Sequence, residues 1–333
     1  MELDFSFIIP VYNRPDEIGE LLASMSVMDG GRDFEIVIVE DGSEVTAEQV
    51  VKDFSENLNI SYYQKANSGP GDSRNYGMSR AKGNYFIILD SDCLLPPHYL
   101  NEVKRALQQA YVDCYGGPDA AHESFSTLQK AINYTMTSIF TTGGIRGNKR
   151  SVGKFQPRSF NMGLSRKAFE RSGGFGDIHP GEDPDLTLRL WKNGFETRLL
   201  PEAYVYHKRR ISWKLFYKQV RKFGLTRPIL NRWHPESKKI TYWFPTLFIT
   251  GMLVSLILCL VGFPYLLYLY LVYLLMIFAG AWYSEGSLLV ACYSVLAILI
   301  QFIGYGIAFA KSELFINLLR RNPREVFPEL FFS

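Results

Sequence analysis

The sequence predicts an α/β domain with a mostly parallel sheet, followed by an amphipathic junction and a C-terminal anchor of transmembrane helices. Short β-rich runs alternate with helical patterns over the first 120 residues. Eleven Lys and Arg stand against one acid in residues 207–240, and no charged residue occurs from Ile240 to Ser284. We therefore expect the α/β domain at 1–206, a basic membrane-interface segment at 207–240, about three transmembrane helices at 241–310 and a basic tail at 311–333.

Strand and helix patterns alternate through the α/β domain. The β-rich runs are Phe5–Pro10, Phe34–Glu40, Ile60–Gln64, Tyr85–Asp90 and, more weakly, Val112–Gly116. Helical patterns separate them at Asp16–Met25, Thr46–Phe54, Asp72–Ala81 and Pro97–Ala110. This alternation predicts right-handed crossovers and a parallel sheet that helices cover on both faces.

The C-terminal third contains apolar runs that are too long for the core of a soluble domain. The uncharged run from Ile240 has 45 residues, and Gly286–Ala310 adds 25 more, whereas one membrane-spanning helix needs roughly 20. We expect spans near Tyr242–Val261, Pro264–Trp282 and Leu288–Ala310. Three spans that start in the cytosol would place the cations of the tail on the opposite face, against the positive-inside bias. Either one segment is re-entrant or one boundary is displaced.

Charge is distributed unevenly along the chain. The net charge is −7 over residues 1–206 and +10 over 207–240, and residues 241–333 are neutral. A basic block beside a first span marks the cytoplasmic side of a membrane. We expect a multi-pass protein of the inner, cytoplasmic membrane whose α/β domain faces the cytosol, and no nucleic-acid partner. Ile211–Arg227 has the spacing of an interfacial helix, with an amphipathic core helix as the alternative.

Polar residues follow three of the expected strands at the point where each strand ends. The first strand runs into Pro10, Tyr12 and Asn13, the second into Glu40 and Asp41, and the fourth into Asp90 and Asp92. In open α/β sheets, ligands bind outside the carboxyl ends of the strands. These side chains therefore predict a ligand site at one edge of the sheet.

Asp90-Ser91-Asp92 places two carboxylates on a strand-to-loop bend, where they can hold a hard divalent cation beside a diphosphate. Two acids in a turn are also common without a metal. Glu40-Asp41-Gly42-Ser43 can accept hydrogen bonds from a nucleobase or a ribose, or can simply be an acidic turn that caps the next helix. Arg74 can contact a base or phosphate, with a solvated helix arginine as the alternative.

Together, Ile9–Arg14, Val39–Ser43, Gly69–Asn75 and Asp90–Asp92 resemble the family-2 inverting glycosyltransferases, over roughly residues 5–230. The resemblance implies a GT-A fold, which is Rossmann-like with a mostly parallel sheet. One departure is Glu40, where the family usually has Asp. The donor-binding residues implied are Pro10, Tyr12, Asn13, Glu40, Asp41, Arg74, Asp90 and Asp92, with Asp92 as the main metal ligand and Asp90 serving ribose or a metal-bound water.

The resemblance continues on the acceptor side, in Phe160–Ser165, Gly173–Phe175 and Gly181–Leu186. It assigns Asp183 as the base that removes the acceptor proton in an inverting transfer, with Glu182 as a hydrogen-bonding partner of sugar or acceptor. The alternative is that these acids only start a helix, where they favour the positive end of its dipole. We assign Asp185 to that capping role.

Two further residues are implied. His207 stands where related enzymes place a third metal or diphosphate ligand, although a lone histidine is usually without such a role. Arg221 lies in a loose form of the family's Gln/Arg segment that closes over the donor, without the Trp of processive synthases.

The expected function is therefore an inverting, metal-dependent hexosyltransferase that uses Mn²⁺ or Mg²⁺. The first expectation for the donor is a UDP-sugar, with GDP- and dTDP-sugars as alternatives. The expected acceptor is a lipid-linked or membrane-associated glycan, in cell-envelope polysaccharide or glycolipid synthesis. Two rivals remain: a polyprenyl-phosphate sugar synthase that acts on the bare lipid phosphate, and a non-catalytic membrane scaffold derived from a glycosyltransferase.

Overall fold

The computed structural model describes residues 2–29, 33–120, 125–142, 154–207 and 212–332. The chain divides into two compact units. The first comprises Met1–His122, Lys149–Lys208 and Phe332–Ser333, and the second comprises Glu123–Asn148 and Arg209–Phe331. We call them the α/β unit and the helical unit.

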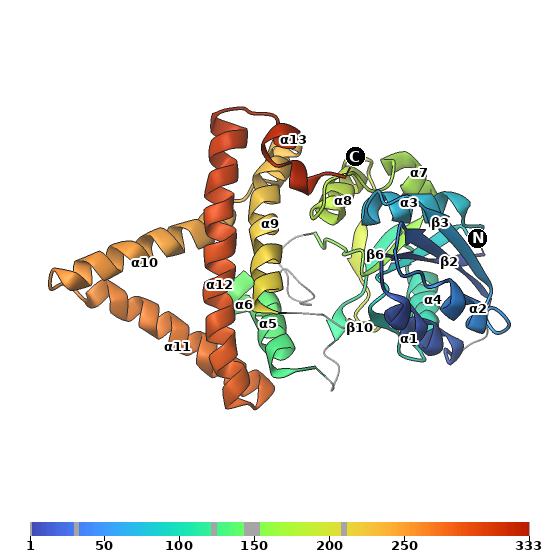
Figure 1. Ribbon diagram of the computed structural model, residues 1–333, viewed down its shortest axis with the longest axis horizontal. Coiled ribbons are helices and arrows are strands. Elements are labelled where there is room, and N and C mark those ends of the chain that lie inside the picture. Colours follow the sequence, from blue (N-terminus) through green and yellow to red (C-terminus); the bar gives the residue numbers. More distant parts are fainter. Residues whose placement is uncertain (1, 30–32, 121–124, 143–153, 208–211, 333) are drawn as a thin grey trace. The chain divides into compact units, whose positions relative to one another are not determined.

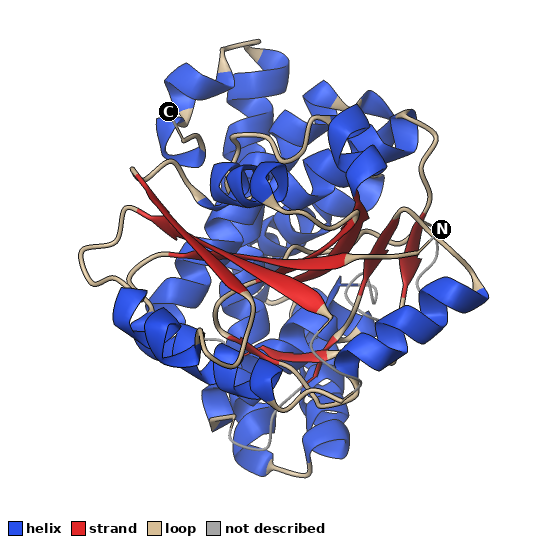
Figure 2. Cartoon of the chain, turned by 90° about the vertical axis from the view of Figure 1, so that its right-hand side faces the viewer, coloured by secondary structure: helices blue, strands red, loops and turns tan. Residues whose placement is uncertain are grey.

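A seven-stranded sheet of order β3-β2-β1-β4-β8-β6-β9 forms the α/β unit, and its twist is visible in Figure 2. Its strands are β1 (Phe5–Val11), β2 (Phe34–Asp41), β3 (Ile60–Lys65), β4 (Tyr85–Leu89), β6 (Cys114–Gly116), β8 (Asn161–Ser165) and β9 (Thr197–Leu199). All neighbouring pairs are parallel except those that β8 makes with β4 and β6. A small second sheet joins β5 (Cys93–Leu94), β10 (Val205–His207) and β7 (Asp119–Ala120).

The helices of this unit follow the predicted alternation. They are α1 (Pro15–Ser26), α2 (Glu48–Phe54), α3 (Pro70–Arg80), α4 (Tyr99–Gln109), α7 (Arg166–Ser172) and α8 (Glu182–Lys192). Successive residues of β1 enter different cores, Phe7 and Ile9 on one face and Ile8 on the other. Because both faces are covered, the strand is apolar nearly throughout, as expected for a parallel sheet. The mostly parallel α/β fold is confirmed.

The register of the central strands brings the predicted polar residues to one edge. Val11 of β1 pairs with Glu40 of β2, and Ile8 pairs with Ile88 of β4. All three strands therefore end at the same side of the sheet, because they run parallel. Gly77 of α3 lets this helix lie close on the sheet, since a Cβ there would be 2.8 Å from Ile8 Cγ2.

The helical unit contains the long apolar segments (Figure 1). Its helices are α5 (Thr127–Thr137), α6 (Ile139–Thr142), α9 (Trp213–Trp233), α10 (Phe244–Leu260), α11 (Tyr265–Glu285), α12 (Leu288–Ser312) and α13 (Pro323–Val326). A 3₁₀ turn, Ile240–Trp243, precedes α10, and a π-helical stretch, Glu313–Leu318, continues α12. Among the described residues, three segments are long and apolar enough to cross a membrane: Ile240–Leu260, Tyr265–Glu285 and Leu288–Leu318. The first two lie within three residues of the expected bounds, and the third extends eight residues beyond its expected end.

Candidate active site

Asp92 lies between Arg14 and His207 beside the small sheet. Arg14 Nη1 donates to Asp92 Oδ2 at 2.5 Å, and His207 Nε2 lies 3.0 Å from Asp92 Oδ1. The imidazole of His207 stacks on Phe160, with ring centroids 5.1 Å apart. Burial favours the neutral carboxyl, but the hydrogen bond and charge of His207 and the charge of Arg14 outweigh it and hold the pKa of Asp92 at about 2. The carboxylate is therefore ionised and available to a cation.

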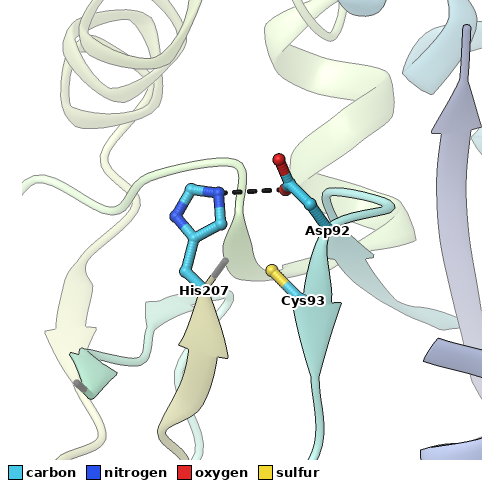
Figure 3. A group of neighbouring side chains, drawn as sticks. All are labelled: Asp92, Cys93 and His207. Atoms are coloured by element: carbon cyan, nitrogen blue, oxygen red, sulfur yellow. Dashed lines mark hydrogen bonds and ion pairs between the residues drawn. The ribbon is translucent and has the colours of Figure 1, made fainter. Parts of the chain in front are cut away.

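His207 reaches Asp92 because β10 pairs with β5, which begins one residue after Asp92. Figure 3 shows Asp92, Cys93 and His207 converging from these two strands. Cys93 differs in chemistry from the other two residues: its Sγ lies 3.4 Å from the Phe160 carbonyl oxygen, and burial raises the pKa of its thiol well above the usual range. A protonated thiol is a poor ligand for a hard divalent cation. Asp92 and His207 fit such an ion, and Cys93 does not.

Arg74 joins the strand edge to the start of α8. It lies on α3, is 3% exposed, and donates to Asp90 Oδ1 at 2.7 Å. Its other terminal nitrogen lies 3.4 Å from Glu182 Oε1 at the start of α8. The guanidinium also lies over the ring of Phe175, 5.3 Å from its centroid. One buried cation thus brings carboxylates from two distant parts of the sequence together.

Glu182 and Asp183 occupy the first turn of α8 and differ in their protonation chemistry. Glu182 Oε1 lies 2.8 Å from His179 Nδ1, and Glu182 Oε2 accepts from the Gly181 N–H at 2.8 Å. Burial opposes ionisation of Glu182, but the hydrogen bond and charge of His179 and then the charge of Arg74 hold its pKa at about 2.

Asp183 has the opposite shift. Burial and then the negative charge of Glu182 raise the pKa of Asp183, although Arg74 lowers it. Its Oδ1 is buried and has no hydrogen-bond partner among the described residues. Two adjacent carboxylates with pKa values pushed apart are a common arrangement of groups that divide acid–base work. Asp183 is the stronger base of the pair.

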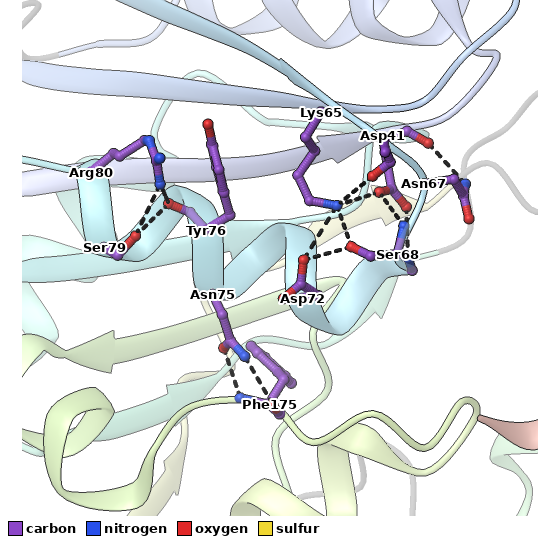
Figure 4. Close-up of polar contacts among 12 residues, drawn as sticks. Asp41, Lys65, Asn67, Ser68, Asp72, Asn75, Tyr76, Ser79, Arg80 and Phe175 are labelled. Carbon is purple, nitrogen blue, oxygen red and sulfur yellow. Dashed lines mark hydrogen bonds and ion pairs between the residues drawn. The ribbon is translucent and has the colours of Figure 1, made fainter. Parts of the chain in front are cut away.

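Asp41 organises the turn before α3 (Figure 4). Its carboxylate accepts from Lys65 Nζ at 2.6 Å, and from the backbone N–H groups of Ser68 and Gly69 at 2.9 Å each. Gly69 has φ of +92° and immediately precedes Pro70, the first residue of α3. Asp41 therefore fixes the position from which α3 carries Arg74 into the site.

Glu40 makes a similar set of contacts on the other side of the same strand end. Its carboxylate accepts from Tyr62 Oη at 2.8 Å, from the Ala47 N–H at 2.9 Å and from the hydroxyl of Ser43. These contacts hold the turn that leads from β2 to α2. A direct contact of Glu40 or Asp41 with a nucleobase or ribose stays a prediction.

The first strand edge is connected to the second through Asn13. Asn13 has φ of +53°, and its Oδ1 accepts from the N–H groups of Glu44 and Val45 at 2.9 and 3.1 Å. Pro10 is partly buried at the end of β1, and the side chain of Tyr12 is 51% exposed. Tyr12 is thus available to a ligand, whereas Asn13 also ties two loops together.

Two predicted residues have partners that the sequence did not suggest. Asp185 lies in the first turn of α8, as expected, and its capping role stays a prediction; its Oδ2 also accepts from Arg189 at 2.7 and 3.0 Å, and Arg189 donates to the carbonyls of Ser172 and Gly174. Through Arg189, the acid therefore anchors the turn that follows α7. Arg221 lies on α9 in the helical unit, 4.0 Å from Glu329, and its role toward a donor stays a prediction.

Three residues of the site were not predicted. His179 lowers the pKa of Glu182, Lys65 neutralises Asp41, and Phe332 belongs to the α/β unit although it follows the apolar helices in the sequence. The Phe332 N–H donates to the Asp177 carbonyl at 3.1 Å, and its ring lies 5.8 Å from that of His179. His179 stands three residues before Glu182, a spacing that could have indicated it; nothing in the sequence indicates Phe332.

Comparisons with known proteins identify glycosyltransferases among the relatives of this chain. The chain is 26% identical to the chondroitin synthase of Escherichia coli over 235 residues, which are 61% of this chain and 34% of that protein. It is 32% identical over 114 residues to the poly(ribitol-phosphate) beta-N-acetylglucosaminyltransferase TarS of Staphylococcus aureus, 33% of this chain and 19% of that protein. This chain thus spans about a third or less of the length of these relatives.

Solved structures share the fold. The mannosyltransferase PcManGT of Pyrobaculum calidifontis, in complex with GDP-Man and Mn²⁺, aligns with a TM-score of 0.57 and 19% identity over 97% of this chain and 89% of that one. Residues 6–173 match the model of Glycosyl transferase family 2. The chain with this carboxylate-lined strand edge therefore belongs to glycosyltransferase family 2.

Proposed function

We propose that this glycosyltransferase is a metal-dependent, inverting hexosyltransferase that moves a sugar from a nucleoside-diphosphate donor to a membrane-associated glycan. The observation that carries the proposal is the position of Arg74. This buried cation contacts Asp90 at the strand edge, which we assign to the sugar donor. It also contacts Glu182 beside Asp183, which we assign to the sugar acceptor. A transfer reaction needs both sides of such a site.

Asp92 and His207 would hold the divalent cation, Mn²⁺ or Mg²⁺, with Asp90 nearby in the sequence. When bound, the cation would neutralise charge that develops on the diphosphate leaving group. Arg14 pairs with the carboxylate of Asp92. A cation at Asp92 would replace that ion pair and leave the guanidinium of Arg14 available to another anion.

Asp183 would act as the general base. Its carboxylate would take the proton of an acceptor hydroxyl while that oxygen forms a bond to the anomeric carbon of the donor. The bond between the anomeric carbon and the diphosphate oxygen would break, and its electron pair would leave with the nucleoside diphosphate. A single displacement of this kind inverts the anomeric configuration. The raised pKa of Asp183 supports this role, because a more basic carboxylate accepts a proton more readily.

The ligands of solved relatives suggest the class of sugar donor, and the apolar helices of the helical unit suggest the location of the acceptor. One structural relative was solved with UDP-GlcNAc and another with GDP-Man, so a UDP- or GDP-sugar is the donor class that we propose, with UDP-sugars first. The three long apolar helices support an acceptor at a membrane, and a lipid-linked glycan is the acceptor that we propose. The basic segment 207–240 supports a cytosolic position of the α/β unit, where nucleotide sugars are made.

The test is a panel of nucleotide sugars given to the full-length protein in detergent, with membrane lipid extract as the source of acceptor. We expect nucleoside diphosphate release from one donor class, its loss in EDTA and its recovery with Mn²⁺ or Mg²⁺. The anomeric configuration of the product, read by NMR, should be opposite to that of the donor. A product of retained configuration, or full turnover in EDTA, would contradict the proposal.

A further inference from the structure

Helix α9 lies beside α12 along its whole length. Trp213, at the start of α9, has its ring 5.6 Å from that of Tyr293. Near the middle, Ser312 Oγ donates to the Leu225 carbonyl at 2.7 Å, and at the end Arg232 Nη1 donates to the Ile316 carbonyl at 3.1 Å. The two helices run in the same direction (Figure 1).

The two backbones approach closely. A Cβ on Gly224 of α9 would lie 2.4 Å from the Tyr305 carbonyl oxygen, and a Cβ on Gly304 of α12 would lie 2.7 Å from Val220. Small residues at such positions allow helices to pack without intervening side chains. If α12 crossed a bilayer, α9 would therefore lie at the same depth in that bilayer.

Helix α9 is unsuited to hydrocarbon. Its 21 residues carry six cations and no acid: Lys214, Lys218, Arg221, Lys222, Arg227 and Arg232. Lys214 and Lys218 are exposed in the helical unit. Charged side chains inside a bilayer are costly and are normally paired or directed toward water. A bilayer crossing by α12 would take these exposed lysines through the membrane with it.

The pair α10 and α11 has the opposite character. Only 11% of the apolar window of each is buried within the structure, against 39% for α12. Near the turn that joins the two helices, Leu260 is 87% and Tyr265 is 75% exposed. The pair contacts α12 through the start of α10 and the end of α11. Thr246 Oγ1 donates to the Gly306 carbonyl at 2.8 Å, and Ile277 and Ala281 pack with residues of α12 in one apolar cluster. The turn extends away from α12 (Figure 1).

We infer that α10 and α11 alone enter the hydrocarbon of the bilayer, as a hairpin whose two ends lie at the same membrane face. Helix α12 stays at that face, packed against α9 and α5. The occupant of the exposed apolar surface of the hairpin is lipid, because 45 consecutive residues without a charge match a hydrocarbon environment and little else.

This arrangement removes the conflict that the sequence raised. With two crossings in place of three, Lys311, Arg320, Arg321 and Arg324 return to the face that holds the basic segment 207–240. Both basic regions then obey the positive-inside bias. Part of the apolar surface of α12, 39% of its window, is covered by protein, a larger share than in α10 or α11.

Accessibility of single cysteines tests the topology. The background is the full-length chain with Cys259→Ala and Cys292→Ser, since Cys93 and Cys114 are fully buried in the α/β unit. Lys238→Cys reports the face before the hairpin, and Leu319→Cys, at a 51% exposed site, reports the face after α12. Right-side-out and inverted membrane vesicles are treated with a membrane-impermeant maleimide, and labelling after denaturation gives the total thiol.

We expect Lys238→Cys and Leu319→Cys to react in the same vesicle type. Phe263→Cys, in the turn of the hairpin, should not react in that type, because the turn lies in or beyond the bilayer. If Leu319→Cys reacts only in the opposite vesicle type from Lys238→Cys, α12 crosses the membrane and the inference is wrong. Reaction of Phe263→Cys together with Lys238→Cys in one type would show that the hairpin is not inserted.

Discussion

The proposed sugar transfer depends on Asp183, whose carboxylate is the general base. We expect Asp183→Asn to lower the turnover rate about 10²- to 10⁴-fold, the usual contribution of one positioned general base. Nucleoside diphosphate binding, measured by titration calorimetry, should change little. Asp29→Asn, at an exposed site, is the matched control for the loss of one charge. A variant that keeps most activity would instead favour a polyprenyl-phosphate acceptor, which is already an anion and needs no base.

The raised pKa of Asp183 predicts the direction of the pH dependence. The base must be ionised to act, so the rate should fall as pH drops through a pKa above the ordinary 3.8 of an aspartate. This acid limb should disappear from the residual activity of Asp183→Asn. Because folding raises this pKa, ionisation at neutral pH destabilises the native state, and Asp183→Asn should unfold at the same temperature as the wild type or a higher one. A lower unfolding temperature would contradict the assigned shift.

Asp92 predicts a different pattern, because its pKa is low and it is the main proposed metal ligand. Asp92→Asn should abolish metal-dependent turnover while the protein still folds and inserts. Activity of His207→Ala should be weakened and should need a higher Mn²⁺ concentration, since one of two proposed ligands remains. The measurement is the initial rate as a function of Mn²⁺ concentration. If His207→Ala has the metal response of the wild type, the histidine only positions Asp92.

At the scale of single elements, α3 connects packing to the site. A Cβ on Gly77 would lie 2.8 Å from Ile8 and 3.2 Å from Val39. Overpacking typically costs about 1–3 kcal/mol, whereas Gly to Ala in a helix gains about 1 kcal/mol. We expect Gly77→Ala to lower the unfolding temperature and, because Arg74 lies on the same helix, to reduce donor binding. The matched control is Ser79→Ala, at an exposed site on α3, which should be near neutral in both measurements.

The sequence predicted these elements well where the pattern was local. The four strands through β4 and the four helices between and after them lie within a few residues of the expected bounds, because apolar runs and turn residues mark them directly. Placement of β8 between β4 and β6, antiparallel to both, was not predicted. That pairing depends on contacts between residues about 80 positions apart, such as Tyr85 with Ser165, which no local pattern encodes.

The site was predictable in its residue types and less so in their partners. Asp90, Asp92, Glu182 and Asp183 follow recognisable patterns, but the shared contact of Arg74 with Asp90 and Glu182 requires the folded chain. Asp185 and Arg189 illustrate both cases: they pair at a spacing of four residues on α8, but the contacts of Arg189 with the carbonyls of Ser172 and Gly174 join α8 to another part of the chain. A residue's neighbours at helical spacing were foreseeable, and its neighbours from other elements were not.

At the scale of the whole molecule, the division into units differs from a simple order along the chain. Residues 123–148 belong to the helical unit although they lie between two segments of the α/β unit, and Phe332 belongs to the α/β unit. The predicted domain at 1–206 is thus interrupted by α5 and α6. Sequence composition could not show that α5 belongs to the helical unit. Helix α5 contains no run of charges and is too short to be a membrane span.

The central claim is that one strand edge holds a metal and a nucleoside diphosphate while a neighbouring helix start supplies the base. Calorimetric titration of UDP, and of GDP in parallel, into the full-length protein tests this most directly. We expect binding that requires Mn²⁺ or Mg²⁺, is lost in Asp92→Asn and is retained in Asp183→Asn. Equal binding in EDTA, or loss of binding in Asp183→Asn with retention in Asp92→Asn, would contradict it.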